Sequence, residues 1–275
     1  WKNLLYFGSF DGHIYVLDAT SGQMTHDPFP ASPKLRPIKY APSSASEKGL
    51  VAVNCNKKII TTYNIVSGAA GWSMRFPKTR VLGQPQASHG KLYFCTEAGE
   101  VIEADHETGS VLNRVALGFN PPVQGRLANG KYFIGSTGGK LVCLEPSRSE
   151  ALWTYDCGEA VTSPPTVAGE LVVVPTETGK LHCLSTSGEL RWTYETNGSI
   201  YQETEGVLFR NNFLIGTAKG QVLCLDIRSG QMLWRYDTRG FSEKPQKGIR
   251  SSGTVSRGRF FVGSEDHSFY ALPVD

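Results

Sequence analysis

A strand and turn pattern that recurs about every 40 residues constrains this chain more than any other feature. Its clearest copy runs from Phe213 to Tyr236. An apolar run is followed by a turn at Ala218-Lys219-Gly220, a second apolar run, a turn at Asp226–Gly230 and a third run that contains Trp234. Short apolar runs separated by glycine-containing turns are typical of an antiparallel β-meander.

One register position of this pattern shows the period. Its occupants are Gly8, Val53, Cys95, Gly135, Pro175, Gly216 and Gly263, separated by 45, 42, 40, 40, 41 and 47 residues. Seven strand-rich units of this length indicate a repeat architecture, and four short strands per unit favour a β-propeller. Because each unit buries its faces only against its neighbours, we expect an all-β fold in which residues 1–275 form one seven-bladed propeller domain.

The repeat also resembles a known family. The stretch Leu225–Trp234 is similar to the tryptophan-docking repeat of the PQQ-like (quinoprotein-type) β-propellers. Leu17–Gly22 matches the first half of that motif, and Glu150–Trp153 and Glu189–Trp192 match its tryptophan end. The resemblance covers the whole chain and implies the fold. It does not imply one function, because the superfamily includes dehydrogenases, outer-membrane assembly lipoproteins, sensor domains and appended domains of adenylating enzymes.

The resemblance assigns a structural role to the repeated tryptophans. One position of the outermost strand is occupied by Trp72, Trp153, Trp192 and Trp234, and by His26 and Asn113 in units one and three. In the docking motif such a tryptophan packs between adjacent blades, where it buries a large apolar area. The acidic or amide residues that precede it, Asp18, Asn64, Asp105, Glu145 and Asp226, are expected to bind turn amides.

The first and last units lack strands. Unit one begins with the second strand of the pattern (4–9), and unit seven stops after its third strand (267–273). Both missing strands would come from one segment upstream of Trp1, so we expect the chain to be a fragment of a longer protein. Without that segment the end blades would leave open strand edges.

Polar side chains are expected at the centre. The stretches predicted as innermost strands are 36–40, 81–86, 123–126, 161–165, 200–204 and 249–254. The candidate ligand-binding residues on them are Gln84, Gln124, Arg126, Ser163, Gln202, Glu203, Arg250 and Ser252. Polar groups that converge on one funnel can bind a small polar ligand, and a merely hydrated channel is the alternative.

Two long connections are expected on one rim. Residues 29–48 contain four prolines and directly follow Pro28, and residues 238–247 contain Glu243-Lys244-Pro245. Proline excludes regular central strand over most of the first connection. Long loops on a rigid scaffold often carry recognition, although both could be plain solvated connectors.

The cysteines and histidines do not form a metal-binding pattern. Cys143, Cys183 and Cys224 share one register position, too far apart between blades for disulfides, and are expected to be small buried hydrophobes. The sequence has no CxxC, and its six histidines are scattered. Free thiols favour a reducing, cytoplasmic compartment, whereas bacterial members of the similar family are often periplasmic.

Several functions are disfavoured. A net charge of +3 without a basic and aromatic cluster gives no reason to expect nucleic acid. No apolar run is long enough to span a membrane, and there is no GxSxG or phosphate loop. A PQQ-dependent dehydrogenase is the least favoured enzyme, because the chain lacks the adjacent Cys-Cys pair that the resemblance would require, and no cofactor is expected.

The leading hypothesis is a non-catalytic binding or scaffolding propeller. It would present a loop rim and a central funnel to a protein, to an upstream domain of its own polypeptide or to a small polar ligand. The alternative is an accessory or sensor domain of a larger enzyme, such as an adenylating enzyme or a kinase.

Overall fold

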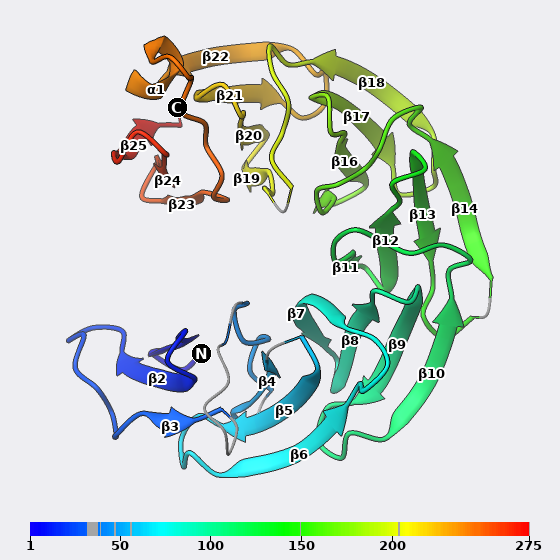
Figure 1. Ribbon diagram of the computed structural model, residues 1–275, viewed down its shortest axis with the longest axis vertical. Helices are drawn as coiled ribbons and strands as arrows, with labels where there is room; N and C mark the ends of the chain where they lie inside the picture. The colour runs from blue at the N-terminus through cyan, green and yellow to red at the C-terminus, as the bar shows by residue number, and fades with distance from the viewer. Residues whose placement is uncertain are drawn as a thin grey trace. The chain divides into compact units, whose positions relative to one another are not determined.

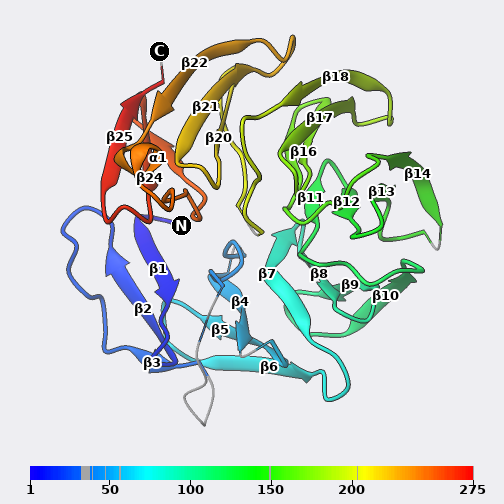
Figure 2. The ribbon, with the colours of Figure 1, turned by 45° about the horizontal axis from the view of Figure 1, so that its top comes forward.

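The structure is a computed structural model that describes residues 1–31, 38, 40–46, 48–55, 57–148, 150–202 and 204–274. These residues form seven antiparallel sheets and one four-residue helix. The chain divides into two compact units, residues 1–120 with 146–149 and residues 121–145 with 150–275. Within each unit the sheets follow one another in chain order (Figures 1 and 2).

The first unit contains three sheets. The first sheet consists of β1 (Leu4–Gly8), β2 (His13–Asp18) and β3 (Phe29–Pro30). The second consists of β4 (Leu50–Cys55), β5 (Ile59–Asn64) and β6 (Ala70–Arg75). The third consists of β7 (Val81–Ser88), β8 (Lys91–Thr96), β9 (Glu100–Asp105) and β10 (Val111–Ala116).

The second unit contains four sheets. The first consists of β11 (Arg126–Ala128), β12 (Lys131–Gly135), β13 (Lys140–Leu144) and β14 (Ala151–Asp156). The next consists of β15 (Thr166–Ala168), β16 (Leu171–Pro175), β17 (Lys180–Ser185) and β18 (Leu190–Glu195). The third consists of β19 (Val207–Phe209), β20 (Asn212–Gly216), β21 (Gln221–Asp226) and β22 (Met232–Asp237). The last has β23 (Thr254–Ser256), β24 (Arg259–Gly263) and β25 (Phe269–Pro273), preceded by α1 (Arg239–Ser242).

The repeat therefore predicts the fold class correctly. Each sheet pairs its strands in sequence order, as a meander does, and the seven sheets are the seven blades of an all-β propeller. Apolar clusters lie between consecutive blades of a unit. One such cluster joins Val173, Leu181 and Cys183 of one blade to Phe213 and Leu225 of the next. Much of the core within each compact unit is thus made of contacts between neighbouring blades.

The repeated cysteines are buried, as predicted. Cys143, Cys183 and Cys224 have fully buried side chains on the third strand of their blades. Each lies directly across the sheet from a tryptophan: Cys143 from Trp153, Cys183 from Trp192 and Cys224 from Trp234. A small apolar side chain at this position leaves room beside the large ring on the neighbouring strand.

The innermost strands of the second unit differ from the prediction. β11, β15, β19 and β23 begin at or beyond the last residue of the stretches expected to form them. Pro164 and Pro165 lack the amide hydrogen that a ladder needs. Gly206 passes so close to a ring that an added Cβ would lie 2.2 Å from Phe213 Cε2. Before the innermost strand begins to pair, the chain therefore passes close to side chains of the neighbouring strand.

Two expected strands are only partly visible. Of the stretch 36–40, residues 36, 37 and 39 lie outside the described residues, while the Ile38 amide donates to Ser9 O at 3.1 Å. In the first blade the outermost strand is reduced to a bridge between Leu17 and Met24 and to β3. Its ladder is interrupted, because the pairing of Met24 with Leu17 and the pairing of Phe29 and Pro30 with β2 are separated by residues outside both.

Candidate functional site

The tryptophans of the repeat dock on the following blade. Trp72 Nε1 donates to His106 O at 2.9 Å, Trp153 Nε1 to Thr186 O at 3.1 Å and Trp192 Nε1 to Ile227 O at 2.8 Å. Each acceptor oxygen belongs to the residue that directly follows the turn residue of its blade, which is Asp105, Ser185 or Asp226. Trp234 is half-buried against the apolar cluster of the last blade. These side chains are thus engaged within the fold.

The two substitutes for tryptophan keep the same hydrogen bond. His26 Nε2 lies 3.1 Å from Ile65 O, and its Nδ1 lies 3.0 Å from Asp27 O. Asn113 Nδ2 donates to Pro146 O. Ile65 and Pro146 occupy the repeat position of Ile227. The sequence did not reveal this role, because the acceptor is a backbone oxygen and leaves no side-chain signature.

Four of the five turn residues bind backbone amides, as predicted. Asp226 Oδ1 accepts from Arg228 N at 3.0 Å and Ser229 N at 2.8 Å. Asp18, Asn64 and Asp105 make the same pair of bonds in their turns. The amide of Ser229 is the main cause of the lowered pKa of Asp226. The carboxylates are therefore structural acceptors in exposed turns.

A polar cluster lies beside the innermost strands of the second unit. Arg126, the first residue of β11, pairs with Glu205, and Gln124 Nε2 donates to Glu205 Oε1 at 3.2 Å. The Glu205 amide donates to Ser252 Oγ at 2.9 Å. Glu205, which the sequence analysis missed, is the hub of this cluster. Glu203, which the sequence predicted as a ligand-binding residue two positions earlier, lies outside the described residues.

A second cluster joins the last two blades. Arg250 Nε binds Glu265 Oε1 at 3.0 Å, and its guanidinium lies 4.1 Å from the centroid of the Tyr201 ring. Tyr201 OH donates to Glu265 Oε2 at 3.0 Å. The bond from Arg250 is the main cause of the lowered pKa of Glu265. A planar guanidinium held by a carboxylate and a ring is a rigid arrangement.

The remaining candidates bind backbone oxygens. Ser163, buried in the fold, donates through Oγ to Tyr201 O at 3.1 Å. Gln202 Nε2 donates to Pro122 O at 3.3 Å. Gln84, on β7 of the first unit, donates through Nε2 to Pro42 O at 3.0 Å. The structure brings Gln124, Arg126 and Ser252 together around Glu205.

The connection 238–247 has a rigid base and an exposed tip. The Gly240 amide donates to Asp266 Oδ2 at 2.9 Å, and the Arg239 amide to Tyr270 OH at 3.0 Å. Tyr270 OH donates to the same carboxylate oxygen at 2.6 Å. Beyond this base, residues 242–246 are exposed. α1 and this loop lie beside β25 in Figures 1 and 2.

The described residues offer no grouped metal ligands. In that part of the chain no three His, Cys, Asp or Glu side chains come close enough together to hold an ion. Among the same residues, no helix has the length and apolar character needed to cross a bilayer. The chemistry available at the clusters above is therefore hydrogen bonding and ion pairing.

Comparison with known proteins identifies relatives. The family described as "Outer membrane protein assembly factor BamB" has a model that matches residues 97–243 and 203–275, together more than half of the chain. A protein of that name from Shewanella oneidensis is 32% identical over 123 residues, which are 42% of this chain and 31% of the relative. One from Nitrosomonas eutropha is 26% identical over 168 residues, 59% of this chain and 41% of the relative.

Solved structures share the fold. The crystal structure of BamB from Moraxella catarrhalis matches with a TM-score of 0.63 and 15% identity, over 99% of this chain and 94% of that one. The computationally designed Ika8 protein matches with a TM-score of 0.68 and 17% identity, over the same shares. At these identities the likeness concerns the fold alone. The matched part of this chain spans about a third to two fifths of the length of the curated relatives.

Proposed function

We propose that this chain, which belongs to the family of PQQ-like propellers described as outer membrane protein assembly factor BamB, is a non-catalytic scaffold that binds another protein. The two curated relatives bear the name of an assembly factor. In this chain Trp72, Trp153 and Trp192, the turn carboxylates and the polar clusters form hydrogen bonds within the fold itself. Polar groups that are bonded within the fold suit a rigid platform better than a reaction centre.

The observation that carries the proposal is the loop 238–247. Its base is fixed by hydrogen bonds from the Arg239 amide to Tyr270 and from the Gly240 amide to Asp266, and Tyr270 and Asp266 bind each other, while residues 242–246 face solvent. A loop ordered before binding loses less conformational entropy when a partner arrives. Its tip carries Glu243, Lys244 and Pro245, which offer a partner both charge signs and a stiff backbone. This loop is therefore the part of the rim that we assign to partner recognition.

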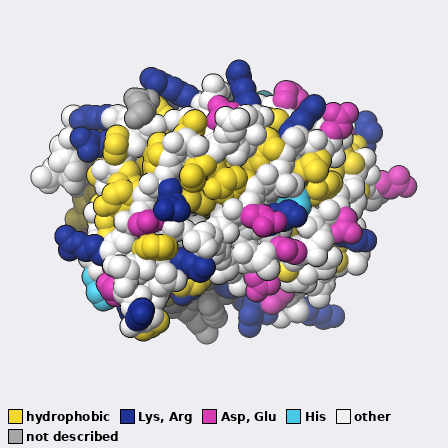
Figure 3. All heavy atoms as spheres, turned by 90° about the horizontal axis from the view of Figure 1, so that it is seen from above, with side chains coloured by type: hydrophobic (Ala, Val, Ile, Leu, Met, Phe, Trp, Pro, Cys, Tyr) yellow, Lys and Arg dark blue, Asp and Glu magenta, His cyan; other side chains and the backbone are white. Residues whose placement is uncertain are grey.

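The neighbouring surface fits the same role. Leu190, Met232, Leu233 and Tyr236 are exposed on β18 and β22. Figure 3, which looks onto the side of the molecule where these strands lie, shows hydrophobic side chains interspersed with charged side chains of both signs. A mixture of apolar and charged groups is usual for surfaces that bind protein.

The polar cluster at the innermost strands is a second contact point in this proposal. Arg126 and Glu205 are 34% and 23% exposed, so both ends of the pair can be reached from solvent. Gln124 and Ser252 hold the pair in place. A polar side chain of a partner, or a small polar ligand, would meet donors and acceptors that are already oriented.

Site-specific photo-crosslinking tests the proposal. A photoreactive amino acid replaces Lys244 in the loop or, as a control, Arg228 in the turn between β21 and β22; both residues are basic, exposed and in the same unit. We expect one defined protein, or one domain of the same polypeptide, to crosslink at position 244 and not at 228. Equal labelling at both positions, or dye reduction that depends on PQQ and calcium, would contradict the proposal.

A further inference from the structure

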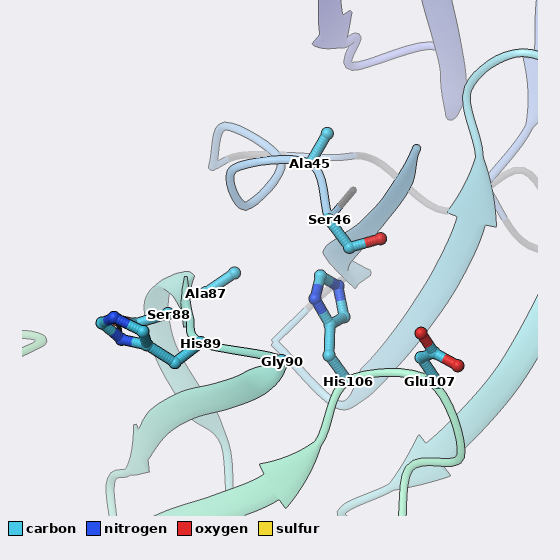
Figure 4. Close-up of a pocket in the computed structure, with 8 residues that line it drawn as sticks. All are labelled: Ala45, Ser46, Ala87, Ser88, His89, Gly90, His106 and Glu107. Carbon is cyan, nitrogen blue, oxygen red and sulfur yellow. Dashed lines mark hydrogen bonds between the residues drawn. The ribbon is translucent and has the colours of Figure 1, made fainter. Parts of the chain in front are cut away.

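A cavity of about 450 Å³ lies in the first unit, away from the clusters described above (Figure 4). Three segments form its walls: Ala45 and Ser46 before β4, the hairpin 87–90 between β7 and β8, and His106 with Glu107 after β9. The volume falls within the range of small-molecule sites. In the other blades the position of His106 holds an apolar residue or, in the fifth blade, Thr186, so the imidazole is specific to this blade.

His106 is the unusual residue of this wall. Its side chain is 1% exposed, and among the described residues its Nε2 atom has no hydrogen-bond partner. In Figure 4 the imidazole rises from its turn toward Ser46, between Gly90 and Glu107. The same repeat position holds Ile65, Ile227 and Val274 in other blades. A buried nitrogen without a partner destabilises a fold, so its presence at a cavity points to an occupant that supplies the partner.

The cavity is preformed. Trp72 Nε1 donates to His106 O at 2.9 Å, and the His106 amide donates to Gly90 O at 3.0 Å. The Ser46 amide donates to Leu50 O at 2.8 Å. All three walls are thus held by hydrogen bonds to neighbouring strands. A ligand would find the imidazole already oriented, so that binding would cost little conformational entropy for ordering the walls.

The lining is polar but has no unbalanced charge. Glu107 binds Lys48 at 2.7 Å, so the two charges compensate each other at the edge of the cavity. Burial lowers the pKa of His106, which keeps its imidazole neutral at pH 7. Ser46 Oγ accepts from the Leu50 amide at 3.1 Å, which leaves its hydroxyl proton available to an occupant. A charged ligand would lose hydration here without gaining a counter-charge.

We propose that this cavity binds a neutral ligand that carries a hydroxyl or primary amide group, with His106 Nε2 and Ser46 Oγ as its hydrogen-bond partners. Hydroxyl and amide groups both donate and accept, so they satisfy a neutral imidazole whichever tautomer it adopts. The methyl groups of Ala45 and Ala87 suit the carbon atoms of such a ligand. The ligand is either a free small molecule or an uncharged polar side chain of a bound protein segment.

Nuclear magnetic resonance of the histidine rings tests this site. The chain, with isotope-labelled histidine, is titrated with D-glucose and with N-acetylglutaminamide, and separately with acetate and guanidinium. His182 serves as an internal reference, because it is also buried and its Nε2 also has no partner among the described residues. We expect a saturable shift of the His106 resonances with a neutral probe, no shift at His182 and no saturable response to the charged probes.

Two variants separate binding from folding. His106→Val places in this blade the residue found at position 274, so it should remain folded and be at least as stable as the wild type. It should bind the neutral probe at least tenfold more weakly. Ser46→Ala should weaken the probe by a smaller factor while keeping the His106 resonances for observation.

The titrations distinguish the two possible sources of the ligand, and they also show whether the proposed site exists. Tighter binding of N-acetylglutaminamide than of D-glucose would assign the site to a protein side chain, and the reverse order to a hydroxylated small molecule. Unchanged binding in folded His106→Val, or a His106 resonance that no neutral probe moves, would overturn the proposal. Neither result bears on crosslinking at Lys244, so this test and that of the scaffold role fail separately.

Discussion

Trp192 donates its indole hydrogen to the backbone oxygen of Ile227 at 2.8 Å, and its ring lies flat over Gly230, three residues further on. A Cβ added to Gly230 would lie 2.6 Å from Trp192 Cδ2. The same relation joins Trp72 to Gly109 and Trp153 to Gly188, at 2.4 and 2.9 Å. The docking motif is therefore a pair: the tryptophan of one blade and the turn glycine of the next.

Gly230→Ala should destabilise the protein more than Gly22→Ala. The two glycines occupy the same turn position, with φ of +73° and +72°, so an alanine suffers the same left-handed strain of about 1–2 kcal/mol at either site. In the part of the chain that the structure describes, no atom lies within 4 Å of a Cβ at Gly22, whereas Trp192 blocks it at Gly230. We expect an additional loss of about 1–3 kcal/mol from overpacking, measured by urea unfolding. Equal losses would show that the ring moves aside freely.

Trp192→Phe and Trp192→Ala should differ in a defined way. Phenylalanine keeps an aromatic ring over Gly230 but removes the bond to Ile227 O, at a cost of about 1 kcal/mol. Alanine removes the ring as well, and the loss for this half-buried side chain should reach about 2–3 kcal/mol. Free energies of unfolding measure both. A phenylalanine variant as unstable as the alanine variant would place the whole effect in the indole hydrogen bond.

Acid should weaken the base of the loop 238–247. Burial acts to raise the pKa of Asp266, but bonds from Tyr270 OH and the amides of Gly240 and Ser268 outweigh it and lower the pKa to about 2. The unfolded value is about 3.9. The folded state therefore favours the carboxylate, and this stabilisation is present above about pH 4 and lost as pH falls toward 2.

Asp266→Asn should accordingly lose stability at neutral pH, by about 1–2 kcal/mol for the weakened bonds. Its deficit relative to wild type should shrink as the pH is lowered from 5 to 2, measured by denaturant unfolding at each pH. Glu195→Gln, at an exposed carboxylate outside this loop, is the control for a general carboxylate effect. A deficit that stays constant with pH would contradict the assigned pKa.

The buried thiols should be inert in the folded protein. Burial raises the pKa of Cys143, Cys157, Cys183 and Cys224 to about 12. Because only the thiolate attacks an alkylating reagent, these four should react with iodoacetamide at pH 8 no faster than the protein opens. Mass spectrometry of peptides alkylated with and without denaturant measures each site. Rapid native labelling of Cys183 would show that its blade interface is open.

Local sequence features predicted much of this architecture. The period of the apolar runs, the turn glycines and the acidic turn residues depend on neighbours a few positions away, so their meaning can be read along the chain. The tryptophan register and the burial of the repeated cysteines followed from the repeat, whereas the position of Cys183 across from Trp192 was seen only in the structure. The innermost strands of the second unit were misplaced by several residues, whereas β7 lies where it was predicted. Close approaches such as Gly206 against Phe213 are not visible in a pattern of hydrophobicity.

By itself the sequence determined the all-β repeat, its number of units and the residues that face each interface, because these follow from periodicity and turn chemistry. Only the tertiary structure decided which partners meet. Arg126 reaches Glu205 across 79 positions, Asn113 replaces an indole by reaching Pro146 O, and His106 lines a cavity with a nitrogen that has no partner among the described residues. Each of these depends on backbone atoms or side chains brought together by blade packing, for which no local pattern of residues is a signal.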